Sequence, residues 1–135
     1  GALEEAVVQA DDTIAAGAPA FDALQATLVA AEALVAAGRL DEAESRLTIA
    51  ADRLDPRQTP AIWAEYLRLR GNLHEQRGAG AEAYHNYAQS ASLLDLLGER
   101  YQAALSRLAI GRLVARTGAR SLARAHLDAA AAVFE

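Results

Sequence analysis

The three histidines are the side chains best suited to bind a metal ion or carry a proton, and their spacing favours neither role. Two histidine ligands on one helix face would be four residues apart. His74 and His85 instead lie on either side of a predicted turn, and His126 stands alone near the C-terminus. Cysteine is absent, which excludes thiolate ligands, a thiol nucleophile and disulfides. We therefore expect no metal site, with His74 in a packing position and the other two histidines partly exposed.

The segment Gly78–Ala83 matches the G-x-G-x-x-A variant of the dinucleotide-binding fingerprint. That motif requires a strand before the glycines and a helix after them, whereas here a helical pattern precedes them. We interpret the segment as a turn between two helices and expect no cofactor.

Nucleophiles and general acids or bases are also poorly placed. No serine lies in a G-x-S-x-G elbow, and no serine or threonine has an evident histidine and acid partner. Adjacent acids such as Glu4 and Glu5 diverge around a helix, so they are better interpreted as surface charges than as an acid/base pair. We expect that the chain is not an enzyme.

The charge of the chain changes sign along its length. The net charge is −5, and all 13 cations are arginine. Residues 1–59 carry a net −7, residues 60–95 a net −1 and residues 96–135 a net +3. Either these are solvated helix faces that happen to differ, or the two ends of the molecule attract unlike surfaces. Because the whole is acidic and aromatic residues are not interleaved with the late arginines, we do not expect direct nucleic-acid binding.

Composition indicates an all-α protein. Apolar residues make up 53% of the chain, aromatic residues only 5%, and alanine, the strongest helix former, is the most frequent residue. No apolar run approaches the roughly 18–20 residues that span a bilayer, so we expect no membrane partner. A chain without disulfides fits a cytoplasmic location. Because no methionine begins the chain, we expect it to be a fragment of a larger protein.

An internal repeat of 40 residues organises the sequence. Six columns recur at that step: Gly38, Gly78 and Gly118; Ala43, Ala83 and Ala123; Leu47, Tyr87 and Leu127; Ala50, Ser90 and Ala130; Ala31, Gly71 and Gly111; Leu34, His74 and Val114. One step back, Val7 and Ala10 fall in register with Leu47 and Ala50.

The columns describe a helical hairpin. The first glycine column ends one helix, because glycine readily adopts the left-handed conformation found there. The next three columns form an i, i+4, i+7 stripe on a second helix. This stripe packs on the preceding helix, where the small residue at 31, 71 or 111 leaves room for a close crossing. We predict about seven antiparallel helices, near residues 2–16, 20–37, 40–54, 60–77, 81–97, 99–117 and 119–134.

Turn residues fall between these helices and divide one predicted domain into a half repeat and three hairpins. Gly17, Pro19 and Asp22 mark the boundary after the half repeat. Gly98 ends the long predicted helix at residues 81–97. Thr59 is suited to an N-cap and Pro60 to a first helical turn. The predicted units are 1–17, 18–57, 58–97 and 98–135.

The columns resemble the tetratricopeptide repeat signature W-x2-L-G-x2-Y, A-x3-F, P. Its glycine, preceding leucine, alanine and aromatic positions are matched by Gly71 and Gly111; Ile110; Ala43, Ala83 and Ala123; and Leu47, Tyr87 and Leu127. The tryptophan position holds Thr27, Leu67 and Arg107, and the period exceeds the typical length of about 34 residues. The resemblance implies a right-handed α–α superhelix. The long repeats look like those of large bacterial signalling and transcriptional regulators.

The resemblance also implies a binding face. In tetratricopeptide solenoids the first helix of each hairpin lines the concave side, which places there Gln25, Leu28, Glu32, Val35 and Ala36; Glu65, Arg68, Asn72, Glu75 and Gln76; and Leu105, Leu108, Arg112, Ala115 and Arg116. From these we select as partner-binding candidates Glu65, Arg68, Asn72, Glu75, Gln76, Leu108, Arg112 and Arg116. A solvated face is the alternative interpretation for the arginines and Asn72.

Two functions follow as expectations. The first is a non-catalytic scaffold that binds a protein or peptide within a larger regulator. The second is a structural role, in which units stack end to end to form a homo-oligomer or act as a spacer.

Overall fold

The computed structural model contains seven α-helices and no strand in the residues it describes. It describes the backbone of residues 1–17, 20–116 and 120–134, and the side chains of residues 1–17, 22–116 and 126–134. The helices are α1 (Ala2–Ala15), α2 (Ala20–Ala36), α3 (Leu40–Arg53), α4 (Pro60–Gln76), α5 (Gly80–Leu96), α6 (Arg100–Arg116) and α7 (Arg120–Phe134). Each described helix end lies within one residue of the predicted end, so the predicted all-α class is confirmed.

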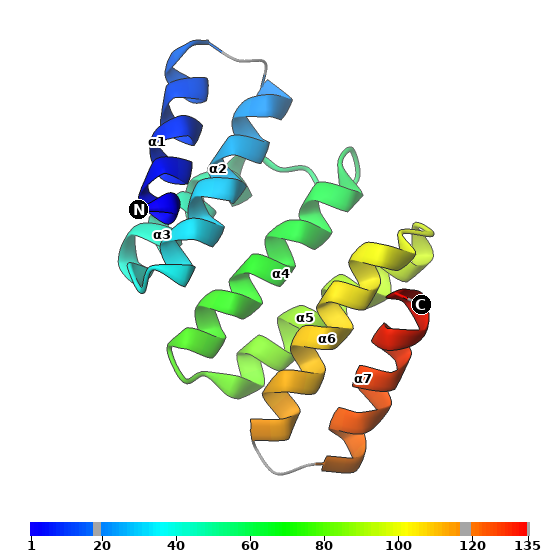
Figure 1. Ribbon diagram of the computed structural model, residues 1–135. Coiled ribbons are helices and arrows are strands. Elements are labelled where there is room, and N and C mark those ends of the chain that lie inside the picture. The colour runs from blue at the N-terminus through cyan, green and yellow to red at the C-terminus, as the bar shows by residue number, and fades with distance from the viewer. Residues whose placement is uncertain (18–19, 117–119, 135) are drawn as a thin grey trace.

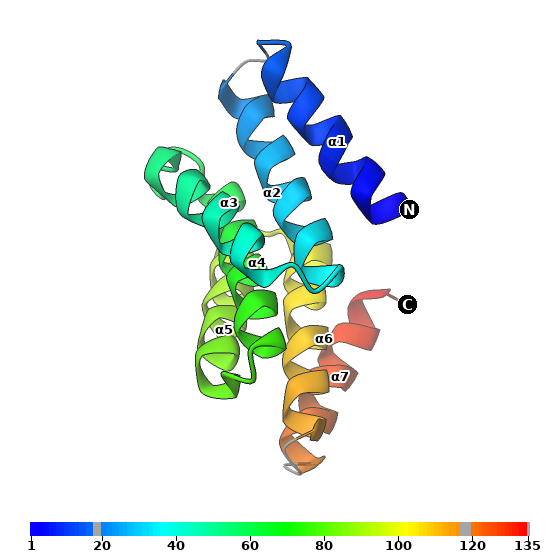
Figure 2. The ribbon, with the colours of Figure 1, turned by 90° about the vertical axis from the view of Figure 1, so that its left-hand side faces the viewer.

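Successive helices pack against each other as a helical solenoid (Figure 1). In Figure 1, α2, α4 and α6 follow one another across the front of the molecule, with α3 and α5 behind them. Figure 2 shows α3 and α5 together on one side, and α1 and α7 on the other. The row formed by α2, α4 and α6 therefore presents a surface that α3 and α5 do not cover.

Glycines with positive φ close the helices, as the sequence predicts. Gly38 and Gly78 both have φ of 78°, and Gly17 and Gly98 have φ of 76°. The amide after Gly38 donates to the carbonyl of Leu34 at 2.9 Å, and the Gly38 amide donates to Val35 at 3.0 Å. This pair of bonds satisfies carbonyls that the helix end leaves free. Gly118 and Pro19 lie outside the described residues.

The small and large columns of the repeat meet between α4 and α5. Tyr87 is buried, and a Cβ built on Gly71 would lie 2.5 Å from its ring atom Cε1. Gly71 is therefore required for the close crossing of these two helices. The core as a whole is a series of clusters along the solenoid, of which the largest joins α2, α3 and α4.

Two buried serines tie three helices together. The Ser90 hydroxyl on α5 donates to the Ala64 carbonyl on α4 at 2.8 Å. Its oxygen lies 2.9 Å from the Ser106 hydroxyl on α6. Because Ser90 has a single hydroxyl proton, Ser106 is the donor in the second bond.

The junction between α3 and α4 differs from the other helix connections. α3 packs less extensively on α4 than α5 does on α6, and residues 54–59 separate α3 from α4. Thr59 occupies the N-cap position of α4 with Pro60 next to it, as predicted, but its side chain makes no capping bond. The Thr59 hydroxyl instead donates to the Asp55 carbonyl at 3.2 Å. It therefore stabilises the connection rather than the helix end.

Candidate functional site

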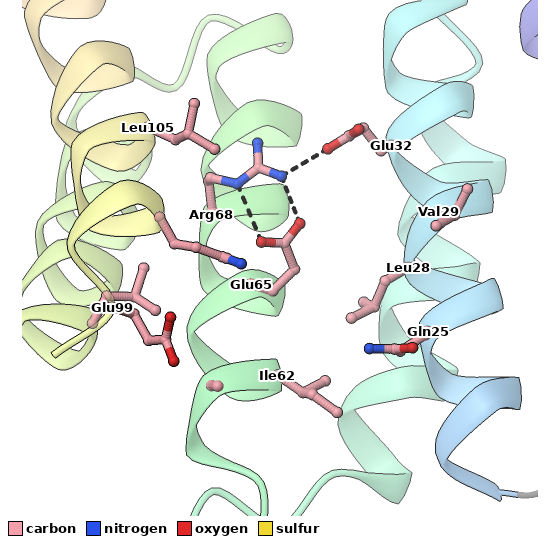
Figure 3. Close-up of a pocket in the computed structure, with 12 residues that line it drawn as sticks. Gln25, Leu28, Val29, Glu32, Ile62, Glu65, Arg68, Glu99 and Leu105 are labelled. Atoms are coloured by element: carbon pink, nitrogen blue, oxygen red, sulfur yellow. Dashed lines mark hydrogen bonds and ion pairs between the residues drawn. The ribbon is translucent and has the colours of Figure 1, made fainter. Parts of the chain in front are cut away.

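A groove of about 510 Å³ runs over the surface formed by α2, α4 and α6. Its lining is Gln25, Leu28, Val29 and Glu32 from α2; Ala61, Ile62, Glu65 and Arg68 from α4; Leu94 from α5; and Glu99, Gln102 and Leu105 at the start of α6. Figure 3 shows the α2 residues on one side, Arg68 and Glu65 in the middle, and Leu105 and Glu99 on the opposite side. The volume is in the range of ordinary ligand sites.

Arg68 is held at the centre of the groove by two glutamates (Figure 3). Its Nη2 lies 2.8 Å from Glu32 Oε2 on α2 and 2.6 Å from Glu65 Oε1 on its own helix. Burial opposes the charge of Arg68, but the hydrogen bonds and charges of Glu65 and Glu32 outweigh burial and raise the pKa of the guanidinium. Arg68 is thus a fixed cation that links α2 to α4.

A second, smaller hollow of about 190 Å³ adjoins the groove and shares Glu32 with it. Its lining includes Asn72, Glu75, Gln76 and Tyr87. The Tyr87 hydroxyl lies 2.7 Å from Asn72 Oδ1 and 2.9 Å from Glu75 Oε1. Glu75 also forms an ion pair with Arg116 of α6. The side chains here are largely bonded to one another.

Burial of the Tyr87 phenol raises its pKa to about 12, although the charge of Arg68 acts in the opposite direction. The hydroxyl therefore remains a hydrogen-bond donor throughout the neutral range. Because the phenol has a single proton, Asn72 Oδ1 and Glu75 Oε1 share it as acceptors.

The structure brings together five of the eight partner-binding candidates. Glu65 and Arg68 line the groove, and Asn72, Glu75 and Gln76 line the second hollow. Leu108 and Arg112 line neither, and Arg116 is placed by its ion pair with Glu75.

Sequence reasoning missed six residues of the groove: Val29, Ala61, Ile62, Leu94, Glu99 and Gln102. Ala61 and Ile62 lie one helical turn before Glu65, so extending the predicted stripe towards the start of α4 would have found them. The same extension towards the start of α6 leads from Leu105 to Gln102 and Glu99. The groove is therefore shifted toward the first turns of α4 and α6.

The described residues contain no group of three or more histidine, cysteine, aspartate or glutamate side chains arranged to hold a metal ion. His74 and His126 are partly buried, and burial lowers the pKa of each imidazole, with nearby arginines acting in the same direction. His126 packs edge-on against the ring of Tyr84. Within residues 1–17, 20–116 and 120–134, no helix has both the length and the apolar character needed to cross a membrane.

No protein-family model, curated protein or solved structure matches this chain. The proposed function therefore rests on the groove and its side chains.

Proposed function

We propose that this chain is a non-catalytic scaffold module that binds a protein or peptide in the groove formed by α2, α4 and α6. The observation that carries the proposal is the combination of apolar and charged side chains in one open surface. Val29 and Leu105 offer apolar contact above the buried side chains of Leu28 and Ile62, while Glu32 and Glu99 offer charge. Protein and peptide partners use both kinds of contact at once.

The exposure of Val29 supports this role. Its side chain is on the rim of the groove and is 55% exposed, which costs free energy in an unbound protein because apolar area remains in water. A partner that covers Val29 together with the apolar lining would recover that free energy. The setting within a larger bacterial signalling or transcriptional regulator belongs to the same proposal and rests on the resemblance to tetratricopeptide repeats.

The test is affinity capture from a native lysate with three baits, followed by mass spectrometry. Val29→Arg places a long charged side chain in the groove, and Ile49→Arg makes the same change at a position on α3 that is 45% exposed and outside the groove. We expect the wild type and Ile49→Arg to retain one or more partners that Val29→Arg loses. A set of captured proteins that is the same for all three baits would overturn binding in the groove.

Arg68→Ala and Asn72→Ala are less suitable as tests. Removing Arg68 leaves two facing glutamates without their shared cation, and removing Asn72 takes away a partner of the buried Tyr87 hydroxyl. Both substitutions change the packing of the empty protein, so a loss of binding would not identify a contact with the partner.

End-to-end self-association is the second candidate function. It is favoured by exposed apolar side chains near the end of α5 and the start of α6: Tyr101 and Phe134 pack edge to face, and Leu96 is 85% exposed. The opposite charges of residues 1–59 and 96–135 would favour contact between unlike ends of two copies. Sedimentation velocity at low and high salt tests this role: a concentration-independent monomer in both would rule it out.

A further inference from the structure

We infer that the occupant of the groove is a cationic amphipathic α-helix, which lays an apolar stripe on the groove floor and directs arginine or lysine side chains to glutamates on both rims. This inference rests on the proposed function and specifies the class of partner.

The apolar part of the groove is contributed by several helices. Leu28 and Val29 of α2 face Leu105 of α6 across the groove, with Ile62 of α4 between them (Figure 3). Leu94 of α5 also lines the groove, but Leu94, Leu28 and Ile62 are buried. The apolar side chains that a partner can reach are therefore Val29 and Leu105. A helix that presents apolar side chains at i, i+3, i+4 and i+7 offers a continuous apolar stripe to side chains contributed by several helices.

The charges around this floor are mainly negative. The groove lining contains three glutamates and one arginine, a formal net charge of −2. Glu32 lies on the α2 side and Glu99 on the α6 side, so acids stand on both rims (Figure 3). Glu99 has no ion-pair partner among the described residues. Cationic side chains that flank an apolar stripe would meet these acids on both sides.

The single groove cation is already paired. Arg68 contacts Glu32 and Glu65 simultaneously, so an incoming carboxylate would have to replace one of two short ion pairs. The carboxylate would also lie near the remaining glutamates, whose negative charges would repel it. This arrangement disfavours an acidic peptide and a free C-terminal carboxylate at Arg68.

The backbone requirement favours a helix over an extended segment. An extended peptide needs partners for its own amides and carbonyls. Apart from the first-turn amides of α4 and α6, the helices that line the groove bond their backbone groups internally. Gln25 and Gln102 are the side-chain amides that line the groove, whereas Asn72 lies in the second hollow and accepts a hydrogen bond from Tyr87. A helical partner satisfies its own backbone and needs only side-chain contacts.

The probes are fluorescein-labelled peptides of about 18 residues, or roughly five helical turns. The first is an amphipathic helix of leucine, alanine and arginine, with arginines on both sides of a leucine stripe. In the second peptide every arginine is replaced by glutamate, and in the third every arginine is replaced by glutamine. A fourth has the composition of the first in an order without an apolar face. Binding is measured by fluorescence anisotropy, with helix formation by circular dichroism.

Because the whole protein is acidic, charge-matched variants separate the groove from general attraction. One variant carries Glu99→Gln, which removes the groove acid that has no ion-pair partner among the described residues, and the control carries Glu82→Gln at an exposed position outside the groove. We expect the arginine peptide to bind most tightly and to gain helix on binding. We expect its affinity to fall about threefold in the groove variant and to change by less than about 1.5-fold in the control.

Each of the remaining outcomes contradicts either the inference or the proposed function. Equal loss in the two variants, or equal binding of the reordered peptide, would overturn the inference because charge alone would explain the affinity. Tighter binding of the glutamate or glutamine peptide, abolished by Val29→Arg, would overturn the cationic partner and leave the proposed function standing. If no peptide binds while Val29→Arg still removes partners in affinity capture, the cationic partner is also overturned and the proposed function stands. The proposed function fails only if that capture does not depend on Val29.

Discussion

Tyr87 occupies space that any side chain at position 71 would need, and its hydroxyl organises the second hollow beside the groove. These two roles belong to one residue, so the packing of α4 on α5 and the arrangement of Asn72 and Glu75 are coupled. Tyr87 therefore belongs both to the repeat pattern and to the candidate site.

Gly71→Ala should destabilise the protein by about 1–3 kcal/mol, because the strain of overpacking exceeds the roughly 1 kcal/mol that alanine contributes as a better helix former. Urea unfolding followed by Trp63 fluorescence measures the effect. Gly80→Ala is the matched control, since its Cβ would meet only Leu113 Cδ1, at 3.9 Å. Its effect should range from neutral to about 1 kcal/mol stabilising. Equal effects at the two positions would contradict the close crossing at Gly71.

Tyr87 should also make stability depend on alkaline pH. Its pKa is raised to about 12 in the folded protein, against about 10 in an unfolded chain. The stabilisation is fully present below about pH 10 and is lost as the pH rises towards 12, because the unfolded state releases its proton first. Unfolding free energies measured across this range should decline less steeply for Tyr87→Phe than for the wild type. Parallel declines would show that Tyr87 does not titrate in this way.

At the scale of secondary-structure elements, α5 joins α4 to α6. It contacts α4 through Tyr87 and Ser90. It contacts α6 through the Ser90–Ser106 hydrogen bond and through the packing of Tyr87 with Ile110. It also supplies Leu94 to the groove. The position of α6 relative to α4, and hence the width of the groove, therefore depends on contacts made by α5.

Ser90→Ala should cost about 1–3 kcal/mol, because it leaves the buried Ser106 hydroxyl without its acceptor. Ser90→Ala combined with Ser106→Ala should cost less than the sum of the single changes, since neither hydroxyl then remains unpaired. Thermal or urea unfolding of the set gives the coupling energy. The exposed Ser92→Ala on the same helix should be nearly silent, and strict additivity of the buried pair would argue against their hydrogen bond.

At the scale of the whole molecule, we expect local stability to differ from one part of the solenoid to another. Its core is divided into successive clusters, so each part depends mainly on its neighbours. α1 buries only Ala10, whereas α4 buries seven residues along its length. The ion pair of Asp11 with Arg46 adds a polar contact between α1 and α3, at largely exposed positions.

Hydrogen exchange should therefore be faster in α1 than in α4. Mass spectrometry of peptides covering residues 2–15 and 60–76 would measure the difference directly. We expect α1 to open without unfolding α4, because the loss of one small cluster leaves the larger one intact. Identical protection of both segments, at the global unfolding free energy, would instead show a single cooperative unit.

The helices and their turns could be predicted from the sequence because they depend on local chemistry. Gly38 and Gly78 end helices through a backbone conformation that other residues rarely adopt, and the apolar stripe at Leu47 and Tyr87 needs only helical periodicity. The tertiary structure decided which side chains share the groove. It placed Glu99 in the groove and left Arg112 outside, and it engaged Asn72 with Tyr87. These outcomes depend on how far each helix pair rotates relative to the last, and that rotation is determined by side-chain packing between helices rather than by the period of the repeat.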